Sequence, residues 1–168
     1  MPNDVFRAID ATLVLSTVED TYREEGTAAN ALITEYDLSN TVGRLHMVTV
    51  SVLSDVKPFY EIGRRYPTHL RPGVVRVSGS AERAHVNGAL LRLLLGDGAL
   101  SPPGPPFFVQ PMFNIDATLR DPTRPEQLTR LTVFGIKFDG WDYHLAMDSD
   151  FVMEQVTFQA MRIAFEEV

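Results

Sequence analysis

A strict alternation of apolar and polar residues limits the folds open to this chain more than any other feature. The alternation is longest and cleanest over residues 107–119. Successive side chains of a β-strand point to opposite faces, so this pattern predicts a strand with one buried face. The apolar positions are Val109, Phe113, Ile115, Ala117 and Leu119, and the polar ones are Gln110, Asn114, Asp116, Thr118 and Arg120.

Other apolar segments carry the same period of two, which predicts a mainly β protein. Residues 46–53 form a half-buried strand, and residues 130–138 are apolar on both sides, which predicts a strand covered on both faces. Residues 151–165 change phase midway, which predicts a bulge or a change of the neighbouring surface. Two further strands are predicted at residues 8–15 and 74–86.

One segment breaks the β pattern. Residues 87–95 read NGALLRLLL, in which the leucines recur at helical spacing. Asn87 is placed to cap the start of a helix, and Gly96 is placed to end it. We therefore predict a single short α-helix whose leucines pack against the sheet.

Three stretches lack a clear period. Residues 17–43 are polar and too long for an ordinary turn, so we predict an extended loop that is mobile or makes contacts outside its own domain. Residues 96–106, GDGALSPPGPP, are rich in Pro and Gly and predict a linker. Residues 120–127 fit a hairpin connection between two strands.

Length and composition set the remaining bounds. The 168 residues suit one domain over 1–168, and 45% hydrophobic with 22% charged residues is typical of globular proteins. The sequence contains no cysteine, which excludes disulfides and thiolate sites. A net charge of −7 disfavours binding to nucleic acid, because such binding needs Lys and Arg. No stretch reaches the length of a membrane helix and no secretory signal is evident, so we expect no membrane contact and a cytoplasmic protein.

The motifs of common enzymes are absent from the sequence. It contains no HExxH pair, no phosphate loop and no GxSxG elbow, so we expect no catalysis, no cofactor and no metal. One local group of acids could hold a hard cation, but its spacing is not that of an EF-hand. A solvated connection between two strands is the favoured interpretation of this group, which comprises Asp139, Asp142, Asp148, Asp150 and Glu154.

Large apolar residues also lie beside loops and strand ends, outside any core that the pattern predicts. Such residues either become buried between subunits or close the ends of the fold. They are Phe59, Tyr60, Ile62, Tyr66, Phe107, Phe108, Met112 and Phe151.

Several motifs in a fixed order resemble the tail tube subunits of contractile phages and related injection particles. Residues 58–98 read PFYEIGRRYPTHLRPGVVRVSGSAERAHVNGALLRLLLGDG, with an IG turn, an RPG turn, an SGS strand followed by ER, and a leucine-rich helix. FNIDATLRDP from residue 113 and LTVFGIKFDGWDYHLAMDSDFVMEQVTF from residue 131 are similar to the closing strands of that family. The resemblance covers about two thirds of the chain and leaves out the first 57 residues.

The resemblance implies both a fold and a role. The fold would be two packed antiparallel sheets, a sandwich or barrel, with one short α-helix and with strands that join a β-barrel shared by six subunits. Hexameric rings would stack into a conduit for DNA ejection, through which DNA passes without specific binding. The partners would be other copies of the chain and the tail sheath, baseplate and tail terminator proteins. The place would be the virion tail, assembled in the host cytoplasm.

The same resemblance suggests roles for particular residues. An acidic lumen would repel the phosphate backbone, and its candidates are Asp10, Glu82, Asp116 and Glu154. These acids could equally lie on ordinary solvated strand faces. Contacts between stacked rings are expected in the loop 17–43, with Glu24, Glu25, Thr27 and Asn30 as candidates. Apolar contacts between subunits are expected at Phe59, Tyr60, Ile62, Phe107 and Phe108.

Three alternatives remain open at the level of the sequence. The chain could cap or initiate a tube, or form the inner tube of a non-phage injection system. A small β-barrel that binds or hydrolyses a ligand through the carboxylates of residues 139–154 belongs to a different class of function.

Overall fold

The computed structural model describes residues 11–17, 23–38, 45–104, 109–121 and 123–167. Its main element is a seven-stranded antiparallel sheet in the order β1-β6-β7-β8-β5-β2, with β9 paired to β7. The mainly β prediction is confirmed. The strands are β1 (Ala11–Thr17), β2 (Leu45–Ser54), β5 (Val75–Ala84), β6 (Phe113–Asp121), β7 (Arg124–His144), β8 (Met153–Ala160) and β9 (Arg162–Glu167).

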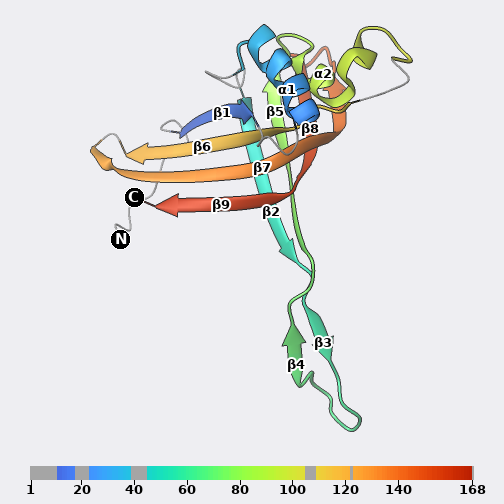
Figure 1. Cartoon of the computed structure of the whole chain (residues 1–168), viewed down its shortest axis with the longest axis vertical. Helices are drawn as coiled ribbons and strands as arrows, with labels where there is room; N and C mark the ends of the chain where they lie inside the picture. Colours follow the sequence, from blue (N-terminus) through green and yellow to red (C-terminus); the bar gives the residue numbers. More distant parts are fainter. Residues whose placement is uncertain (1–10, 18–22, 39–44, 105–108, 122, 168) are drawn as a thin grey trace.

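The 21-residue strand β7 joins the two halves of this sheet. Its first half pairs with β6 on one side and β9 on the other, and its second half pairs with β8. Figure 1 shows β6, the first half of β7 and β9 running across the molecule while β2 and β5 run along it. The expected pair of separate sheets is therefore one continuous sheet, and over the described residues it does not close into a barrel.

The change of phase predicted within residues 151–165 has a structural cause. β8 ends at Ala160, and the backbone N–H of Met161 donates to the carbonyl oxygen of Phe134. The chain then continues as β9 along the first half of β7, away from β5. The neighbouring surface changes at this point, as the pattern indicated.

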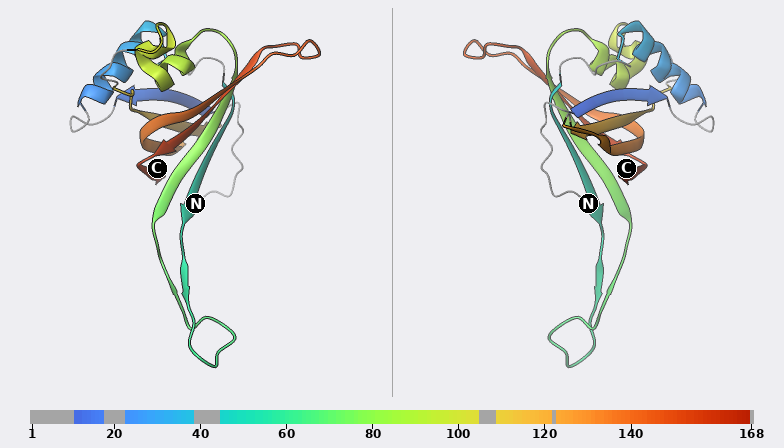
Figure 2. Two further views of the ribbon diagram at one scale, coloured as in Figure 1. Left: turned by 90° about the vertical axis from the view of Figure 1, so that its right-hand side faces the viewer. Right: turned by 90° about the vertical axis from the view of Figure 1, so that its left-hand side faces the viewer.

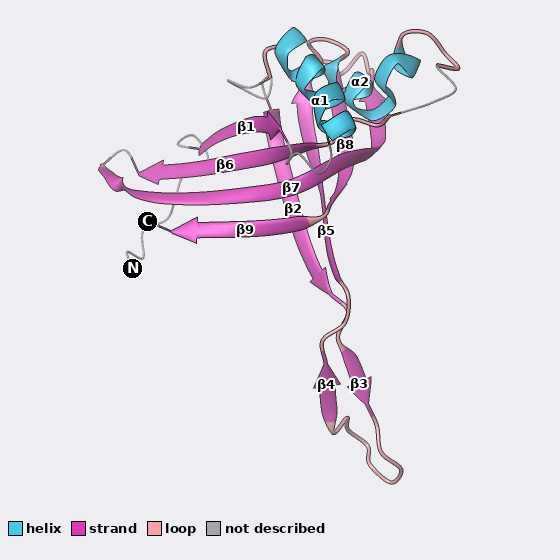
Figure 3. Ribbon diagram, in the orientation of Figure 1, coloured by secondary structure: helices cyan, strands magenta, loops and turns pink. Residues whose placement is uncertain are grey.

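Two α-helices lie together at one end of the sheet (Figure 3). The predicted helix is confirmed as α2 (Ala89–Leu95), followed by a short 3-10 turn, η3 (Gly96–Ala99). Asn87 Oδ1 accepts the first helical N–H, that of Ala89, and Gly96 ends α2 with a φ of +59°. The predicted linker therefore begins with the 3-10 turn, and its residues 105 and 106 lie outside the described segments.

The second helix, α1 (Arg23–Glu35), corrects the expected loop at residues 17–43. Its buried side consists of Gly26, Ala29, Leu32 and Ile33, which lie three or four residues apart as helical packing requires. Arg92 of α2 donates to both carboxylate oxygens of Glu35 at 2.9 Å and to the hydroxyl of Tyr36 at 3.2 Å. The hydrogen bond with Tyr36 raises the pKa of Arg92, so this link between the helices stays charged at ordinary pH.

The core lies between the helices and one face of the sheet. Both halves of the sheet contribute to it, and α1 and α2 close it from one side. Because alternate residues of each strand point inward, every strand of the sheet supplies part of the same apolar cluster. Its largest fully buried apolar side chains are Phe113, Phe158, Leu38, Leu90, Leu93 and Ile136.

Beyond the sheet, the chain between β2 and β5 projects as a narrow hairpin, which we call the arm (residues 55–74). It contains the short strands β3 (Lys57–Phe59) and β4 (His69–Arg71), and its base is closed by a hydrogen bond from Asp55 N to Val74 O. Figure 2 shows the arm extending away from the rest of the molecule, which we call the body (the described residues outside 55–74). No helix in the described segments is long and apolar enough to span a membrane.

Candidate assembly surfaces

Polar side chains cover one face of the half-sheet formed by β2, β5, β8 and the end of β7. Thr49 pairs with Ser80, and Ser80 pairs with Thr157, so all three point to the same side. The next residues along β5, Val77 and Ala81, point to the opposite side and join the core. We call the outer side the polar face; by register it comprises Thr49, Ser51, Ser78, Ser80, Glu82, Lys137, Asp139, Asp142, Gln155, Thr157 and Gln159.

Asp139 is held over this polar face by its neighbours on β8. Its carboxylate accepts a hydrogen bond from Thr157 Oγ1 at 2.6 Å and another from Gln159 Nε2 at 3.0 Å. The residue lies at an irregularity of register between Phe138 and Gly140, which displaces it from the regular ladder. The face thus presents hydroxyl, amide and carboxylate groups, with Met47, Leu53 and Arg76 at its ends.

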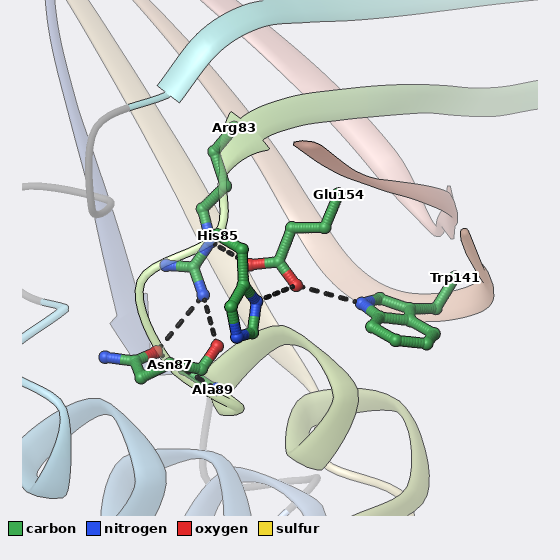
Figure 4. Close-up of polar contacts among 6 residues, drawn as sticks. All are labelled: Arg83, His85, Asn87, Ala89, Trp141 and Glu154. Carbon is green, nitrogen blue, oxygen red and sulfur yellow. Dashed lines mark hydrogen bonds and ion pairs between the residues drawn. The ribbon is translucent and has the colours of Figure 1, made fainter. Parts of the chain in front are cut away.

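Behind the polar face, a buried ion pair joins β5 to β8 (Figure 4). Arg83 Nε lies 2.6 Å from Glu154 Oε1, and both side chains are only 1% exposed. The two residues are direct partners in the antiparallel ladder, which places their side chains on the same side of the sheet. A charged pair that is closed off from water needs further hydrogen bonds to offset its desolvation.

Trp141 and Asn87 make these further hydrogen bonds, and His85 lies close to the same carboxylate. Trp141 Nε1 donates to Glu154 Oε2 at 3.1 Å, and His85 Nδ1 lies 3.3 Å from the same oxygen. Arg83 Nη2 donates to the carbonyl oxygen and to Oδ1 of Asn87, each at 3.1 Å. The cluster therefore links β5, β7, β8 and the start of α2, and its carboxylate is occupied and screened from solvent. This arrangement suits a structural role.

The predicted lumen acids prove to be in different environments. Glu82 lies half-buried on the polar face, whereas Asp10 lies outside the described residues. Glu154 is buried, because it follows the inward phase of Val156 and Phe158 on β8, so its prediction as a channel residue is corrected.

Asp116 is also unsuited to a solvent-facing role. It is 7% exposed, and its carboxylate accepts hydrogen bonds from Ser16 Oγ at 2.9 Å and Thr132 Oγ1 at 2.8 Å. The sequence pattern placed Asp139 in a solvated connection and missed its position on the polar face, because the bulge beside it was not visible as a break in the alternation.

The residues expected in a ring-contacting loop lie instead on the first turns of α1. Glu24, Thr27 and Asn30 are exposed there. Glu25 is half-buried, and its carboxylate binds Lys137 Nζ of β7 at 2.6 Å. Glu25 thus attaches the helix to the sheet, while the other three residues remain accessible.

Three of the predicted intersubunit apolar residues lie on the arm. Phe59, Tyr60 and Ile62 are exposed there, as is every other residue of the arm. Phe107 and Phe108 lie outside the described residues. The arm also carries Tyr66, which the sequence pattern had placed outside the core, and Leu70, which it had not; both are exposed.

A second projection connects β7 to β8, and we call it the acidic hairpin (residues 143–152). Figure 2 shows it leaving the body at the end opposite to the arm. Leu145, Met147 and Phe151 are exposed along it, together with Asp148 and Asp150. In the described part of the chain, no three His, Asp or Glu residues are grouped so that they could hold a metal ion.

Comparison with known proteins identifies the fold. No protein-family model and no curated protein matches the sequence. Among solved structures, a chain of the sheath–tube complex of the PVC extracellular contractile injection system matches with a TM-score of 0.59 and 12% identity. This match covers 99% of the present chain and 93% of the other.

Two further matches also extend over nearly the whole chain. The tube-terminating cap of the anti-feeding prophage gives a TM-score of 0.63 at 9% identity, covering 100% and 95% of the two chains. The tail tube of SPP1 gives 0.56 at 8% identity, covering 98% and 80%. The chain has a tail-tube fold. This fold is shared by tube proteins and by proteins that cap or terminate a tube.

Proposed function

We propose that the chain is a structural subunit that assembles into rings, and that the rings stack into the tube of a phage tail or a related injection particle. The observation that carries this proposal is the tail-tube fold, which extends over at least 98% of the chain in its matches to a phage tail tube and an injection-system complex. The chain would act as a passive conduit and not as an enzyme.

The free edges of the sheet support ring formation. In the described part of the chain, β2 pairs only with β5, and β9 pairs only with β7. An exposed edge offers unpaired N–H and C=O groups that invite a neighbouring strand. In a ring of identical copies, the β2 edge of each subunit pairs with the β9 edge of the next, and this covers both of these edges. We propose six subunits per ring.

The polar face is the surface that we assign to the lumen. Its hydroxyl and amide groups are uncharged, and its acids, Glu82, Asp139 and Asp142, repel phosphate. Of the cations on this side, Lys137 is paired with Glu25 at 2.6 Å and Arg76 lies at one end of the face. Strong binding of nucleic acid requires Lys or Arg contacts to phosphates. A wall of this composition lets DNA pass without holding it, which a conduit for ejection requires.

The other exposed surfaces are assigned to contacts outside the ring wall. We propose that Phe59, Tyr60 and Ile62 of the arm are buried against another copy of the chain. The exposed side of α1, with Glu24, Thr27 and Asn30, is a second candidate for contact with a neighbouring ring or with a sheath. Baseplate and terminator proteins would bind the two ends of the tube, in a virion or injection particle assembled in the host cytoplasm.

A tube-capping role is the second candidate, because the anti-feeding prophage cap matches with a TM-score of 0.63 over the full chain. Negative-stain electron microscopy of the purified protein at increasing concentration separates the two roles. A tube subunit gives hollow filaments of uniform width, whereas a cap gives single rings. A protein that stays monomeric at every concentration contradicts both.

A further inference from the structure

The arm differs in charge from the rest of this acidic chain. It holds four of the 15 Lys and Arg residues but only two of the 22 Asp and Glu residues. Lys57 is paired with Asp55 at the base of the arm, at 2.8 Å. The remaining basic residues are Arg64, Arg65 and Arg71, with Arg64 and Arg65 next to the turn at Gly63. The tip of the arm is therefore cationic on a protein of net charge −7.

The arm also lacks a core of its own. Ile62 and Tyr66 are 107% and 81% exposed, and β3 and β4 pair over only three residues each. An isolated two-stranded hairpin is marginally stable in water. Aromatic residues together with Arg are the composition that is enriched at the centres of protein interfaces. The arm thus has the character of an interface whose partner surface lies elsewhere.

The acidic hairpin has the complementary properties. It contains Asp148 and Asp150 and no Lys or Arg. Met147 is 105% exposed, and Leu145 and Phe151 are exposed beside it. Figure 2 shows the arm and the acidic hairpin leaving the body at different ends and in different directions. One chain cannot join its own two projections, whereas two chains can.

We propose that the arm of one copy docks on the acidic hairpin of a second copy, with Arg64 and Arg65 facing Asp148 and Asp150. Ile62 and Tyr66 then pack against Leu145 and Met147, which removes apolar surface of both copies from water. The two surfaces differ, so each copy donates an arm and accepts one, and such a contact propagates from subunit to subunit. This inference rests on the proposed function, since it names the contact by which copies join.

The absence of cysteine from the sequence permits a direct test by crosslinking. Ile62→Cys and Met147→Cys are made in separate proteins, because both positions are fully exposed and their substitution leaves the body intact. On oxidation under assembly conditions, the mixture gives a disulfide-linked dimer that neither protein gives alone. The control replaces Met147→Cys by Leu100→Cys, an exposed position outside both projections, and gives no such dimer.

Charge reversal provides a second, independent test. The pair Arg64→Glu and Arg65→Glu places like charges across the contact and should raise the protein concentration needed for assembly by about 100-fold. Adding Asp148→Arg and Asp150→Arg to the same chain should restore assembly. The control reverses Arg120 and Arg124, which are exposed on β6 and β7 outside the proposed contact surfaces, and should leave assembly unchanged.

The outcomes separate this contact from the proposed function. Failure of the unchanged protein to form rings or filaments removes the proposed function itself. Normal assembly of the unchanged protein combined with no Ile62–Met147 crosslink, or with no rescue by the second pair of reversals, overturns the docking site and leaves the tube. If reversal of the arm charges abolishes assembly and the second pair of reversals does not restore it, the arm binds a different surface. This result also overturns the proposed contact.

Discussion

The body and the arm of this chain differ in the burial of their side chains. In the body, strands and helices enclose a core whose charged residues Arg83 and Glu154 are almost fully buried and mutually paired. In the arm, all residues are exposed, including aromatic ones. The same chain thus devotes one region to folding by itself and another to a surface that only a partner can cover. The difference teaches that stability and assembly should respond to different substitutions.

The largest effect on stability is expected at the buried ion pair. Glu154→Ala leaves the guanidinium of Arg83 buried without its carboxylate, which should lower the free energy of unfolding by about 3–5 kcal/mol. Thermal or urea denaturation measures this loss. Glu126→Ala, an exposed carboxylate on β7, is the matched control and should change little. Equal losses of stability for the two variants would contradict the claim that the buried carboxylate contributes more than the exposed one.

A smaller effect is expected where β5 packs closely against its neighbours. Gly79 lies opposite Phe158, and a Cβ there would overlap the carbonyl oxygen of Thr49 and the ring of Phe158. Gly79→Ala should therefore destabilise the body by about 1–3 kcal/mol, as overpacking does. Gly88→Ala serves as control, because a Cβ at Gly88 meets nothing within 4 Å. A lower midpoint in denaturant for the Gly88 variant than for the Gly79 variant would contradict the packing described.

The polar face should tolerate substitution better than the core. Asp139→Ala removes two hydrogen bonds, to Thr157 and Gln159, at an exposed site, so the expected loss of stability is about 0.5–1 kcal/mol. Chemical denaturation measures it, and Asp142→Ala on the same strand is the comparison. A loss as large as that of Glu154→Ala would mean that Asp139 belongs to the structural core.

The smallest effect on stability is expected in the arm. Phe59→Ala and Ile62→Ala should each change the free energy of unfolding of the monomer by less than about 0.5 kcal/mol, since both side chains are exposed. The same substitutions should impair assembly, which sedimentation velocity detects. Phe158→Ala in the core is the contrast and should unfold the chain at far lower denaturant, because it removes a fully buried aromatic ring.

The sequence predicted strands better than it predicted surfaces. Alternation located the strands and even the change of phase near Met161, because burial of one face imposes a period of two. It missed α1, since the side of that helix that packs inward begins with Gly26 and Ala29, which add little to an apolar pattern. It misplaced Glu154, although that residue shares the phase of Val156 and Phe158, because acids are normally expected in solvent.

The pairing between strands that are distant along the chain could not be predicted from the sequence. The register that places Arg83 opposite Glu154 joins residues 71 positions apart, and no local signal specifies it. The turn motifs near Gly63 and Gly73 predicted turns, but not that the chain leaves the sheet after Ser54 and returns to it at Val75. The continuous sheet likewise depends on β7 changing partners along its length, which alternation alone cannot show.

Hydrogen–deuterium exchange of the monomer and of the assembled state tests the difference between body and arm most directly. Backbone amides of β7 and β8 should be protected in both states, because they lie in the middle of the sheet. Amides of residues 55–74 should exchange rapidly in the monomer and become protected on assembly. Protection of the arm in the monomer, or rapid exchange of the arm in assembled particles, would contradict the assignment of this region to contacts between copies.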